Sequence, residues 1–183
     1  MIWLTSDTHF GDNRFQLFYR KFKSVEEQDN YFIKVWNETV KPEDKVICLG
    51  DFAVPKEGLL QASKLNGHKI LVRGNYDEQF TDDELLKYFD SVHPELKIKM
   101  NNETFYLNHY PTKGKSNMFN IVGHIHSLWK VQRNMVNVGL DAWNYQLVSK
   151  DELLFAINAI RKFYDANVFA GQLDCNKQTT PTT

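Results

Sequence analysis

The stretch "LVRGNYD" (residues 71–77) is an apolar run that passes directly into glycine, asparagine, an aromatic residue and aspartate. This order is typical of a buried strand that ends in a tight polar turn. Two earlier stretches, "MIWLTSD" (residues 1–7) and "KVICLGD" (residues 45–51), also end in aspartate after an apolar run. These three strands are predicted to form the core of the first half of the chain.

Helices are predicted between and after these strands. Ser24 with Glu27 and Thr81 with Glu84 have the spacing of a capping box, and Pro55 is typical of a first helical residue. The predicted helices cover residues 24–40, 55–65 and 81–89. Strands and helices that alternate at this spacing indicate a parallel α/β sheet.

The second half of the chain is rich in β segments. From about residue 92 it contains the runs "ELKIKM", "ETFYLNHY", "NIVGHIH", "SLWKV" and "MVNVGL". Asn101 and Asn102 stand between the first two runs, and asparagine at both positions suits the positive φ angles of a tight hairpin. This half is therefore predicted to be mainly antiparallel or mixed.

A last helix is predicted from the capping box of Ser149 and Glu152. Apolar residues spaced for one helix face follow, namely Leu153, Ile157, Ile160 and Phe163. The simplest way to bury the whole pattern is an α/β protein in which two β-containing halves pack face to face between helices. We expect residues 1–166 to form a single domain and residues 167–183 to form a disordered polar tail.

Composition excludes several classes of protein. The chain has 183 residues, 42% of them hydrophobic, so it can bury a core without disulfides. Its net charge of −1 gives no strong signal for nucleic-acid or membrane binding. Two cysteines, of which Cys48 is expected to be buried, favour a reducing compartment. With no apolar run as long as a membrane span and no signal-peptide layout, we expect a soluble cytoplasmic protein.

Potential metal ligands follow every predicted core strand. They are Asp7, His9, Asp51, Asn75, His109, His124 and His126. Because the carboxyl ends of strands in an open α/β sheet line a common crevice, these residues can meet although they lie far apart in the sequence. In "DTH" and "HIH" the candidates are two residues apart, and such positions project to the same side of an extended backbone. Each pair is therefore predicted to bind metal together.

The candidates offer oxygen and nitrogen donors and no thiolate. This set favours Mn, Fe, Zn or similar ions over a structural zinc site. Two divalent cations against two carboxylates leave a net charge of about +2, which attracts an anion. Two ions about 3.5 to 4 Å apart can generate hydroxide from a bridging water and hold the phosphate oxygens of an in-line displacement. The pattern therefore predicts phosphate ester hydrolysis.

These motifs give the chain a resemblance to the calcineurin-like metallophosphoesterases. That family's pattern of DxH, GD, GNH(D/E), an isolated His and GHxH is matched in order over about two thirds of the chain, from Asp7 to His126. The resemblance implies a four-layer α-β-β-α sandwich of two mixed β-sheets flanked by helices. It also implies two divalent metal ions, with Mn favoured and Fe, Zn, Ni or Mg as alternatives. It implies one ion at Asp7, His9 and His126, another at Asn75, His109 and His124, and a bridging role for Asp51.

Tyr76 departs from the family pattern, which usually has a histidine there as the proton donor to the leaving alkoxide. A tyrosine phenol stays protonated near neutral pH and can donate a proton, although not in the acidity range of an efficient acid. It could equally form a wall of the pocket. The departure favours a phosphodiesterase, acting on cyclic or short nucleotide-type diesters with good leaving groups. The candidate catalytic residues are Asp51, Asn75, Tyr76 and His109.

Other interpretations stay open. A phosphomonoesterase or protein phosphatase would use the same chemistry, and a non-catalytic scaffold would keep the fold. Retention of all seven ligand types argues against the scaffold, because buried carboxylates and imidazoles without metal cost stability. Asp12 is expected to lie behind a ligand or to be solvated, and Asp77 to orient a neighbour. Scattered basic residues either steer phosphate or are solvated, namely Arg14, Arg73, Lys113, Lys115 and Arg133.

Overall fold

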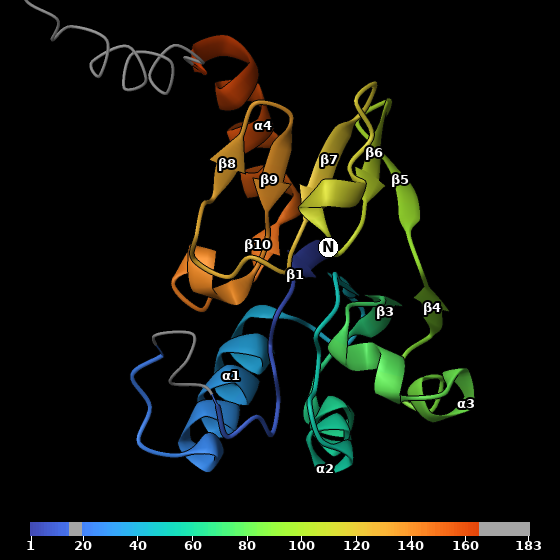
Figure 1. The fold of residues 1–183 in the computed structure, drawn as a ribbon, viewed down its shortest axis with the longest axis vertical. Coiled ribbons are helices and arrows are strands. Elements are labelled where there is room, and N and C mark those ends of the chain that lie inside the picture. Colours follow the sequence, from blue (N-terminus) through green and yellow to red (C-terminus); the bar gives the residue numbers. More distant parts are fainter. Residues whose placement is uncertain (15–19, 165–183) are drawn as a thin grey trace, which may run out of the picture.

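The computed structural model describes residues 1–14 and 20–164, so the predicted polar tail at 167–183 lies outside the described residues (Figure 1). Two five-stranded sheets form the centre of the molecule, and helices flank them. None of the helices in the described part of the chain is long and apolar enough to cross a membrane.

The first sheet is built from the strand–helix alternation of the first half of the chain. Its strand order is β10-β1-β2-β3-β4, and all neighbours are parallel except β10, which runs antiparallel to β1. The strands are β1 (Ile2–Thr5), β2 (Lys45–Cys48), β3 (His68–Val72), β4 (Ser91–His93) and β10 (Val148–Ser149). The predicted parallel sheet is confirmed.

The second sheet is mixed, as predicted for the second half. Its order is β5-β6-β7-β9-β8, with β6, β7 and β9 parallel and both edges antiparallel. Asn101 and Asn102 form the predicted hairpin turn with φ angles of 45° and 65°. The run "SLWKV" is a strand only at its end. The strands are β5 (Leu96–Met100), β6 (Glu103–Leu107), β7 (Phe119–Val122), β8 (Val131–Gln132) and β9 (Met135–Asn137).

The predicted helices form, although two are shorter or less regular than expected. The hydroxyls of Thr81 and Ser149 complete capping boxes, and Ser24 caps its helix through one hydrogen bond. The third helix ends at Leu85 instead of continuing to about residue 89. The helices are α1 (Val25–Thr39), α2 (Lys56–Leu59) continued by the 3₁₀ turn Leu60–Lys64, α3 (Asp82–Leu85) and α4 (Lys150–Phe163).

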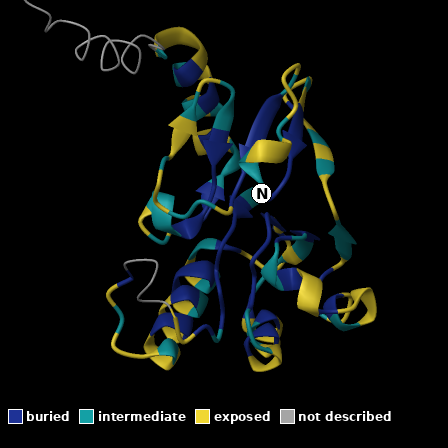
Figure 2. Cartoon of the chain, viewed as in Figure 1, coloured by how far each residue is buried: buried dark blue, intermediate teal, exposed yellow. Residues whose placement is uncertain are grey.

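Two hydrophobic clusters hold these layers together. Along β2, Val46 and Cys48 belong to the cluster beneath α1 and α2, whereas Ile47 belongs to the cluster between the sheets. This alternation is what a strand buried on both faces requires. Figure 2 shows that the central strands are buried, that the edge strands β4, β5 and β8 are only partly buried, and that the outer faces of the helices are exposed. The predicted sandwich of two mixed sheets flanked by helices is confirmed, but Phe163, predicted on the buried face of α4, is 72% exposed.

The core between the sheets gives a direct test of the fold. Phe105 is fully buried there, whereas Phe155 on α4 is 77% exposed. Phe105→Ala is expected to lower the free energy of unfolding by about 3–5 kcal/mol, because apolar contact is lost and a cavity remains. Phe155→Ala removes the same atoms and should change it by less than about 0.5 kcal/mol. Urea unfolding measures both, and equal losses would contradict this assignment of the core.

The loops after the parallel strands of both sheets meet at one edge. The backbone N–H of Asp7 donates to the carbonyl of Gly50 at 3.0 Å, which joins the loops after β1 and β2. In the second sheet, the N–H of Gly123 donates to the carbonyl of His109 at 3.0 Å. The parallel strands of each sheet therefore deliver their following residues to the same place.

Candidate metal centre

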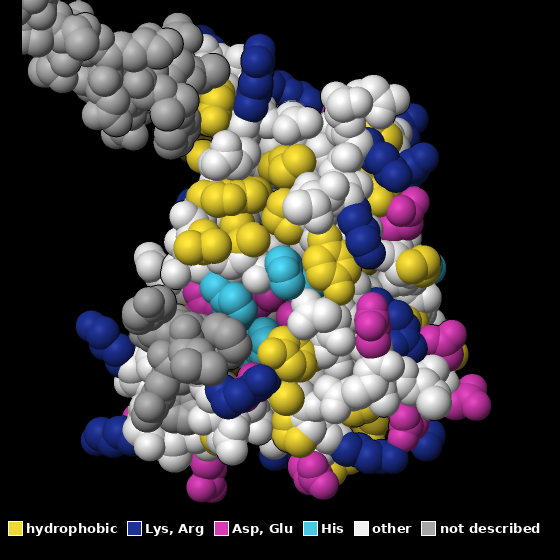
Figure 3. All heavy atoms as spheres, in the orientation of Figure 1, with side chains coloured by type: hydrophobic (Ala, Val, Ile, Leu, Met, Phe, Trp, Pro, Cys, Tyr) yellow, Lys and Arg dark blue, Asp and Glu magenta, His cyan; other side chains and the backbone are white. Residues whose placement is uncertain are grey.

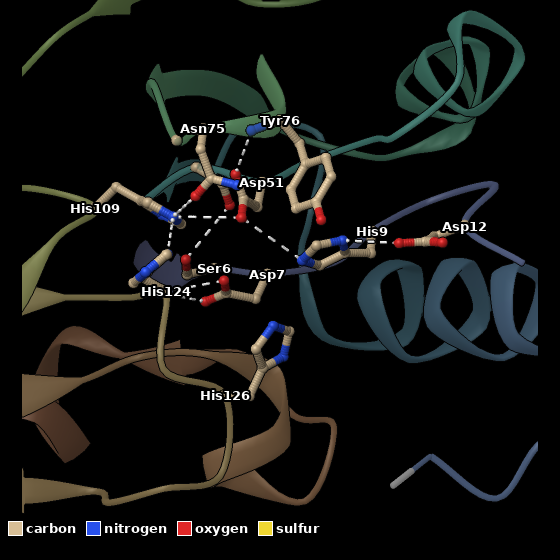
Figure 4. Close-up of polar contacts among 12 residues, drawn as sticks. Ser6, Asp7, His9, Asp12, Asp51, Asn75, Tyr76, His109, His124 and His126 are labelled. Atoms are coloured by element: carbon tan, nitrogen blue, oxygen red, sulfur yellow. Dashed lines mark hydrogen bonds and ion pairs between the residues drawn. The ribbon is translucent and has the colours of Figure 1, made fainter. Parts of the chain in front are cut away.

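The candidate ligands converge where the two sheets meet (Figure 4). Within each of two groups, one potential ligand atom per residue lies within 4.8 Å of the others. The first group is Asp7, His9 and His126, and the second group is Asp51, His109 and His124. Asn75 adjoins the second group, with its Oδ1 at 3.3 Å from Nε2 of His109. All seven residues singled out in the sequence thus lie together.

Asp51 lies between the two groups. Its Oδ2 is 3.7 Å from Nε2 of His9, in the first group, and 3.3 Å from Nε2 of His109, in the second. Its Oδ1 accepts a hydrogen bond from the backbone N–H of Tyr76 at 2.9 Å. One carboxylate oxygen therefore faces both groups, which is the position that a bridging ligand needs.

The backbone at these residues is not extended, so the premise of the spacing argument is wrong, and the pairing it predicts holds for "DTH" but not for "HIH". Five candidate ligands have positive φ angles, between 49° and 75°: Asp7, His9, Asp51, His124 and His126. Non-glycine residues rarely adopt this left-handed region, and clusters of them are typical of functional sites. As a result His124 and His126 point into different groups, although Asp7 and His9 share one.

The glycines of the motifs are required by close approach. A Cβ on Gly74 would lie 2.3 Å from Oδ1 of Asp51 and 2.9 Å from Cε1 of His109. A Cβ on Gly123 would lie 2.0 Å from the hydroxyl oxygen of Ser6 and 2.9 Å from Oδ2 of Asp7. Both positions leave no room for a side chain, because the backbone there lies against the candidate ligands.

Asp77 organises the loop around Asp51, as predicted. Its carboxylate is fully buried and accepts hydrogen bonds from the backbone N–H groups of Asp51, Phe52 and Gly74 at 2.8 to 3.1 Å. Burial raises the pKa of Asp77 to about 6, and these N–H groups oppose the rise. The loops after β2 and β3 are thereby tied to each other.

The electrostatics of the centre favour positive charge. Burial opposes a charge on His109, but Asp51 and Asp7 outweigh it and raise the pKa of His109 to about 9. Burial likewise opposes ionisation of Asp51, yet the hydrogen bond with His109 keeps its pKa below the ordinary value. Buried carboxylates that stabilise a proton on an imidazole would also stabilise a bound cation.

Two carboxylates lie behind the histidines of the first group. Asp12 is buried, and its Oδ2 is 3.2 Å from Nδ1 of His9, so it is not solvated. Asp141 accepts from Nδ1 of His126 at 2.7 Å and from Nε of Arg20 at 2.8 Å. Sequence reasoning missed Asp141 and Arg20, because a contact between residues 121 positions apart leaves no local signal.

Two tyrosines stand beside the histidines, each with a cation over its ring. The Tyr76 ring centroid is 5.1 Å from that of His9, and Cζ of Arg14 lies 5.0 Å from the Tyr76 centroid. The ring of Tyr110 packs edge-on against His109 at 4.9 Å, with Nζ of Lys113 at 4.3 Å from the Tyr110 centroid. Of the five basic residues singled out in the sequence, Arg14 and Lys113 thus lie beside the tyrosines of the centre.

The other basic residues do not reach the centre. Arg73 donates to the carbonyls of Asp77 and Phe80, so it fixes a loop. Lys115 lies over the ring of Tyr106 at 5.0 Å. Arg133 lines a separate cavity of about 690 Å³ at the far end of the second sheet.

The centre is open on one face of the molecule. Figure 3 shows histidine and acidic side chains gathered in a hollow of this face, with hydrophobic side chains along one side of it. His124 is exposed and His126 half-buried, whereas Asp7, His9 and His109 are buried. A ligand arriving from solvent therefore meets imidazoles first and carboxylates beneath them.

The donor set fits divalent cations of the first transition series. Carboxylate oxygens, imidazole nitrogens and one amide oxygen suit Mn, Fe and Zn, and the buried thiol of Cys48 belongs to the hydrophobic cluster beneath the helices. Two mixed sheets bring two such groups to one edge, with the carboxylate of Asp51 between them, and this arrangement supports a metal-dependent phosphoesterase. The chain belongs to the calcineurin-like phosphoesterase family, whose model matches residues 1–168.

Relatives of this chain occur in archaea, bacteria and phages. An uncharacterised protein of Methanocaldococcus jannaschii is 31% identical over 165 residues, covering 82% of this chain and 87% of that protein. The gene 66 protein of Mycobacterium phage L5 is 28% identical over 198 residues, covering 87% and 95%. The crystal structure of a protein of unknown function from Aquifex aeolicus is similar at 28% identity and a TM-score of 0.69, over 86% of this chain and 99% of that one.

Proposed function

We propose that this protein hydrolyses phosphodiesters at a dinuclear metal centre. The observation that carries the proposal is the position of Asp51, whose Oδ2 lies within 3.7 Å of a histidine of each group. In this assignment Asp7, His9 and His126 would hold one ion, and Asp51 would contribute to both. Asn75, His109 and His124 would hold the other ion.

The chemistry follows from the charge of the site. Two divalent cations would supply an activated water and neutralise the phosphate oxygens of an in-line displacement. The chain itself supplies the orientation. Asp77 and Gly74 hold Asp51 in place, and the backbone N–H of His124 donates to the carboxylate of Asp7 at 2.9 Å. These groups are fixed before a substrate arrives, so little reorganisation is needed during the reaction.

The preference for diesters rests on Tyr76. Its ring packs against His9, and Arg14 lies over its face, so the residue is held as a wall beside the first group. A phenol is a poorer proton donor near neutral pH than the imidazolium that the family pattern implies at this position. Substrates whose leaving groups need no protonation are therefore favoured, and we propose cyclic or short nucleotide-type diesters.

The proposal is tested with an activated diester and the matching monoester. Bis(p-nitrophenyl) phosphate and p-nitrophenyl phosphate share a leaving group, so their turnover by the purified protein with Mn compares the two substrate classes. We expect the diester to be hydrolysed faster, the activity to vanish on chelation and to return with Mn. Activity that survives chelation would contradict a metal-dependent reaction, and a faster monoester reaction would contradict the diester preference alone.

Substitutions at Tyr76 test whether its side chain only lines the substrate pocket or donates a proton to the leaving group. If the ring is a wall, Tyr76→Phe should keep turnover of the activated diester within about threefold, and Tyr76→His should raise monoester turnover, because general acid catalysis contributes about 10²- to 10⁴-fold. Steady-state rates of both variants on both substrates measure this. A loss of about 100-fold in Tyr76→Phe would instead make the phenol the proton donor.

Three finer assignments belong to the same proposal. Mn is favoured as the native metal on the mixture of oxygen and nitrogen donors. The free, buried thiol of Cys48 favours the reducing cytoplasm. Residues 1–166 are proposed to act as one domain, since both groups draw ligands from both sheets or from the loops between them.

A further inference from the structure

The two histidines of the first group share an outer partner of the same kind. Nδ1 of His9 lies 3.2 Å from Oδ2 of Asp12, and Nδ1 of His126 lies 2.7 Å from Oδ2 of Asp141. A carboxylate accepts, so Nδ1–H donates in both rings and the Nε2 lone pair is left for a cation. Each imidazole therefore presents a defined nitrogen to the centre.

An arginine anchors each of these carboxylates. Arg14 donates to Oδ1 of Asp12 through Nε at 2.9 Å and to Oδ2 through a terminal nitrogen at 3.0 Å. Arg20 makes the same two-pronged contact with Asp141, at 2.8 and 2.9 Å. Two parallel hydrogen bonds fix a carboxylate in angle as well as in distance. The carboxylates can therefore hold the imidazoles rigidly.

The second group has weaker outer support. Nδ1 of His109 donates to the backbone carbonyl of Leu49 at 2.7 Å, which is a neutral partner. The ring of His124 is exposed, and within residues 1–14 and 20–164 no carboxylate hydrogen-bonds to it. Nδ1 of His124 instead lies 3.1 Å from Nε2 of His109. The imidazole of His124 is thus held by the rings of His109 and Tyr110 and, within the described residues, not by a carboxylate.

Outer carboxylates raise the basicity of a ligating imidazole and fix its orientation, and their loss typically costs about 10- to 100-fold in metal affinity. We infer that the first group holds its ion more tightly than the second group, and that Asp12 with Arg14 and Asp141 with Arg20 are the positioning pairs responsible. The ions would then load in order, and the second ion would exchange with the medium. This inference rests on the proposed dinuclear centre.

Calorimetric titration of the metal-free, full-length protein with Mn tests the order of loading. We expect two phases, with dissociation constants that differ by at least about tenfold. His124→Ala should remove the weak phase and leave the tight one, whereas His126→Ala should remove the tight phase. Electron paramagnetic resonance of Mn at one equivalent should give the spectrum of an isolated ion, and at two equivalents that of a coupled pair.

The positioning pairs are tested by Asp12→Asn and Asp141→Asn. Each should weaken the tight phase by about 10- to 100-fold and leave the weak phase unchanged. Asp44→Asn is the matched control, because Asp44 is also buried but bonds to Trp3 and to the N–H of Lys41, far from both groups. If the buried Arg20 prevents folding of Asp141→Asn, Asp12→Asn still decides, since the side chain of Arg14 is 42% exposed.

The outcomes separate the inference from the proposed function. Two ions of equal affinity, or a tight phase that survives in both aspartate variants and in His126→Ala, would overturn the inference and leave a dinuclear enzyme intact. Binding of fewer than two ions would contradict the proposed function, and this inference with it. Two unequal phases, with the tight one weakened by either aspartate variant, would support the inference.

Discussion

Replacing Asp51 with asparagine is expected to lower turnover of an activated phosphodiester by at least about 1,000-fold, or about 4 kcal/mol in transition-state stabilisation. A single hydrogen-bond donor to a transition state contributes about 10²- to 10³-fold, and a carboxylate shared by two cations does more. The asparagine keeps the shape of the side chain and can still accept the N–H of Tyr76, now at 2.9 Å from Oδ1 of Asp51. It loses the charge that faces both histidine groups.

Asp83→Asn is the matched control for this change. Asp83 is exposed on α3 and contacts neither group, so its substitution should leave turnover within about twofold. Calorimetry with Mn completes the comparison, because the Asp51 variant should bind less than two equivalents of metal. Full activity in Asp51→Asn, with both ions bound, would contradict a role for the Asp51 carboxylate in metal binding and turnover.

Gly74→Ala is expected to have the second-largest effect, on stability and activity together. The added methyl would lie 2.3 Å from Oδ1 of Asp51 and 2.6 Å from its backbone nitrogen, so that loop must move. Overpacking of this kind costs about 1–3 kcal/mol in the free energy of unfolding. A displacement of Asp51 by about 1 Å should cost a further 100-fold in turnover. Urea unfolding and the diester assay measure the two effects separately.

Gly114→Ala adds the same methyl where the chain can accept it. Gly114 has a φ of −57°, and its nearest obstacle is the terminal methyl of Met135, which can swing aside. We expect a change of less than about 1 kcal/mol in the free energy of unfolding and unchanged turnover. Equal losses of stability and turnover in both variants would mean that the effect of a methyl at residue 74 is not specific to the candidate metal centre.

Much of the fold could be predicted because local signals and periodicity agree. Capping boxes at Thr81 and Ser149, the paired asparagines and the apolar strands all act within a few residues. Convergence of the seven candidate ligands also followed, since residues after parallel strands meet at one edge. Their role as metal ligands stays a prediction.

The features of the site that could not be predicted from the sequence depend on contacts between distant segments. The left-handed backbone at His124 and His126 is imposed by neighbouring loops, so spacing alone assigned both residues to one ion. Asp141 meets His126 only because η5 (Leu140–Trp143) follows β9 and lies beside the loop after β1, where Leu140 N–H donates to Ser6 O at 3.1 Å. Such partners have no signature near either residue.

Anomalous diffraction from crystals grown with Mn would locate the bound ions themselves. We expect two Mn peaks about 3.5 to 4 Å apart, with Asp51 in contact with both. One peak should lie among Asp7, His9 and His126, and the other beside His109 and His124. A single peak, or peaks that Asp51 does not contact, would contradict the account.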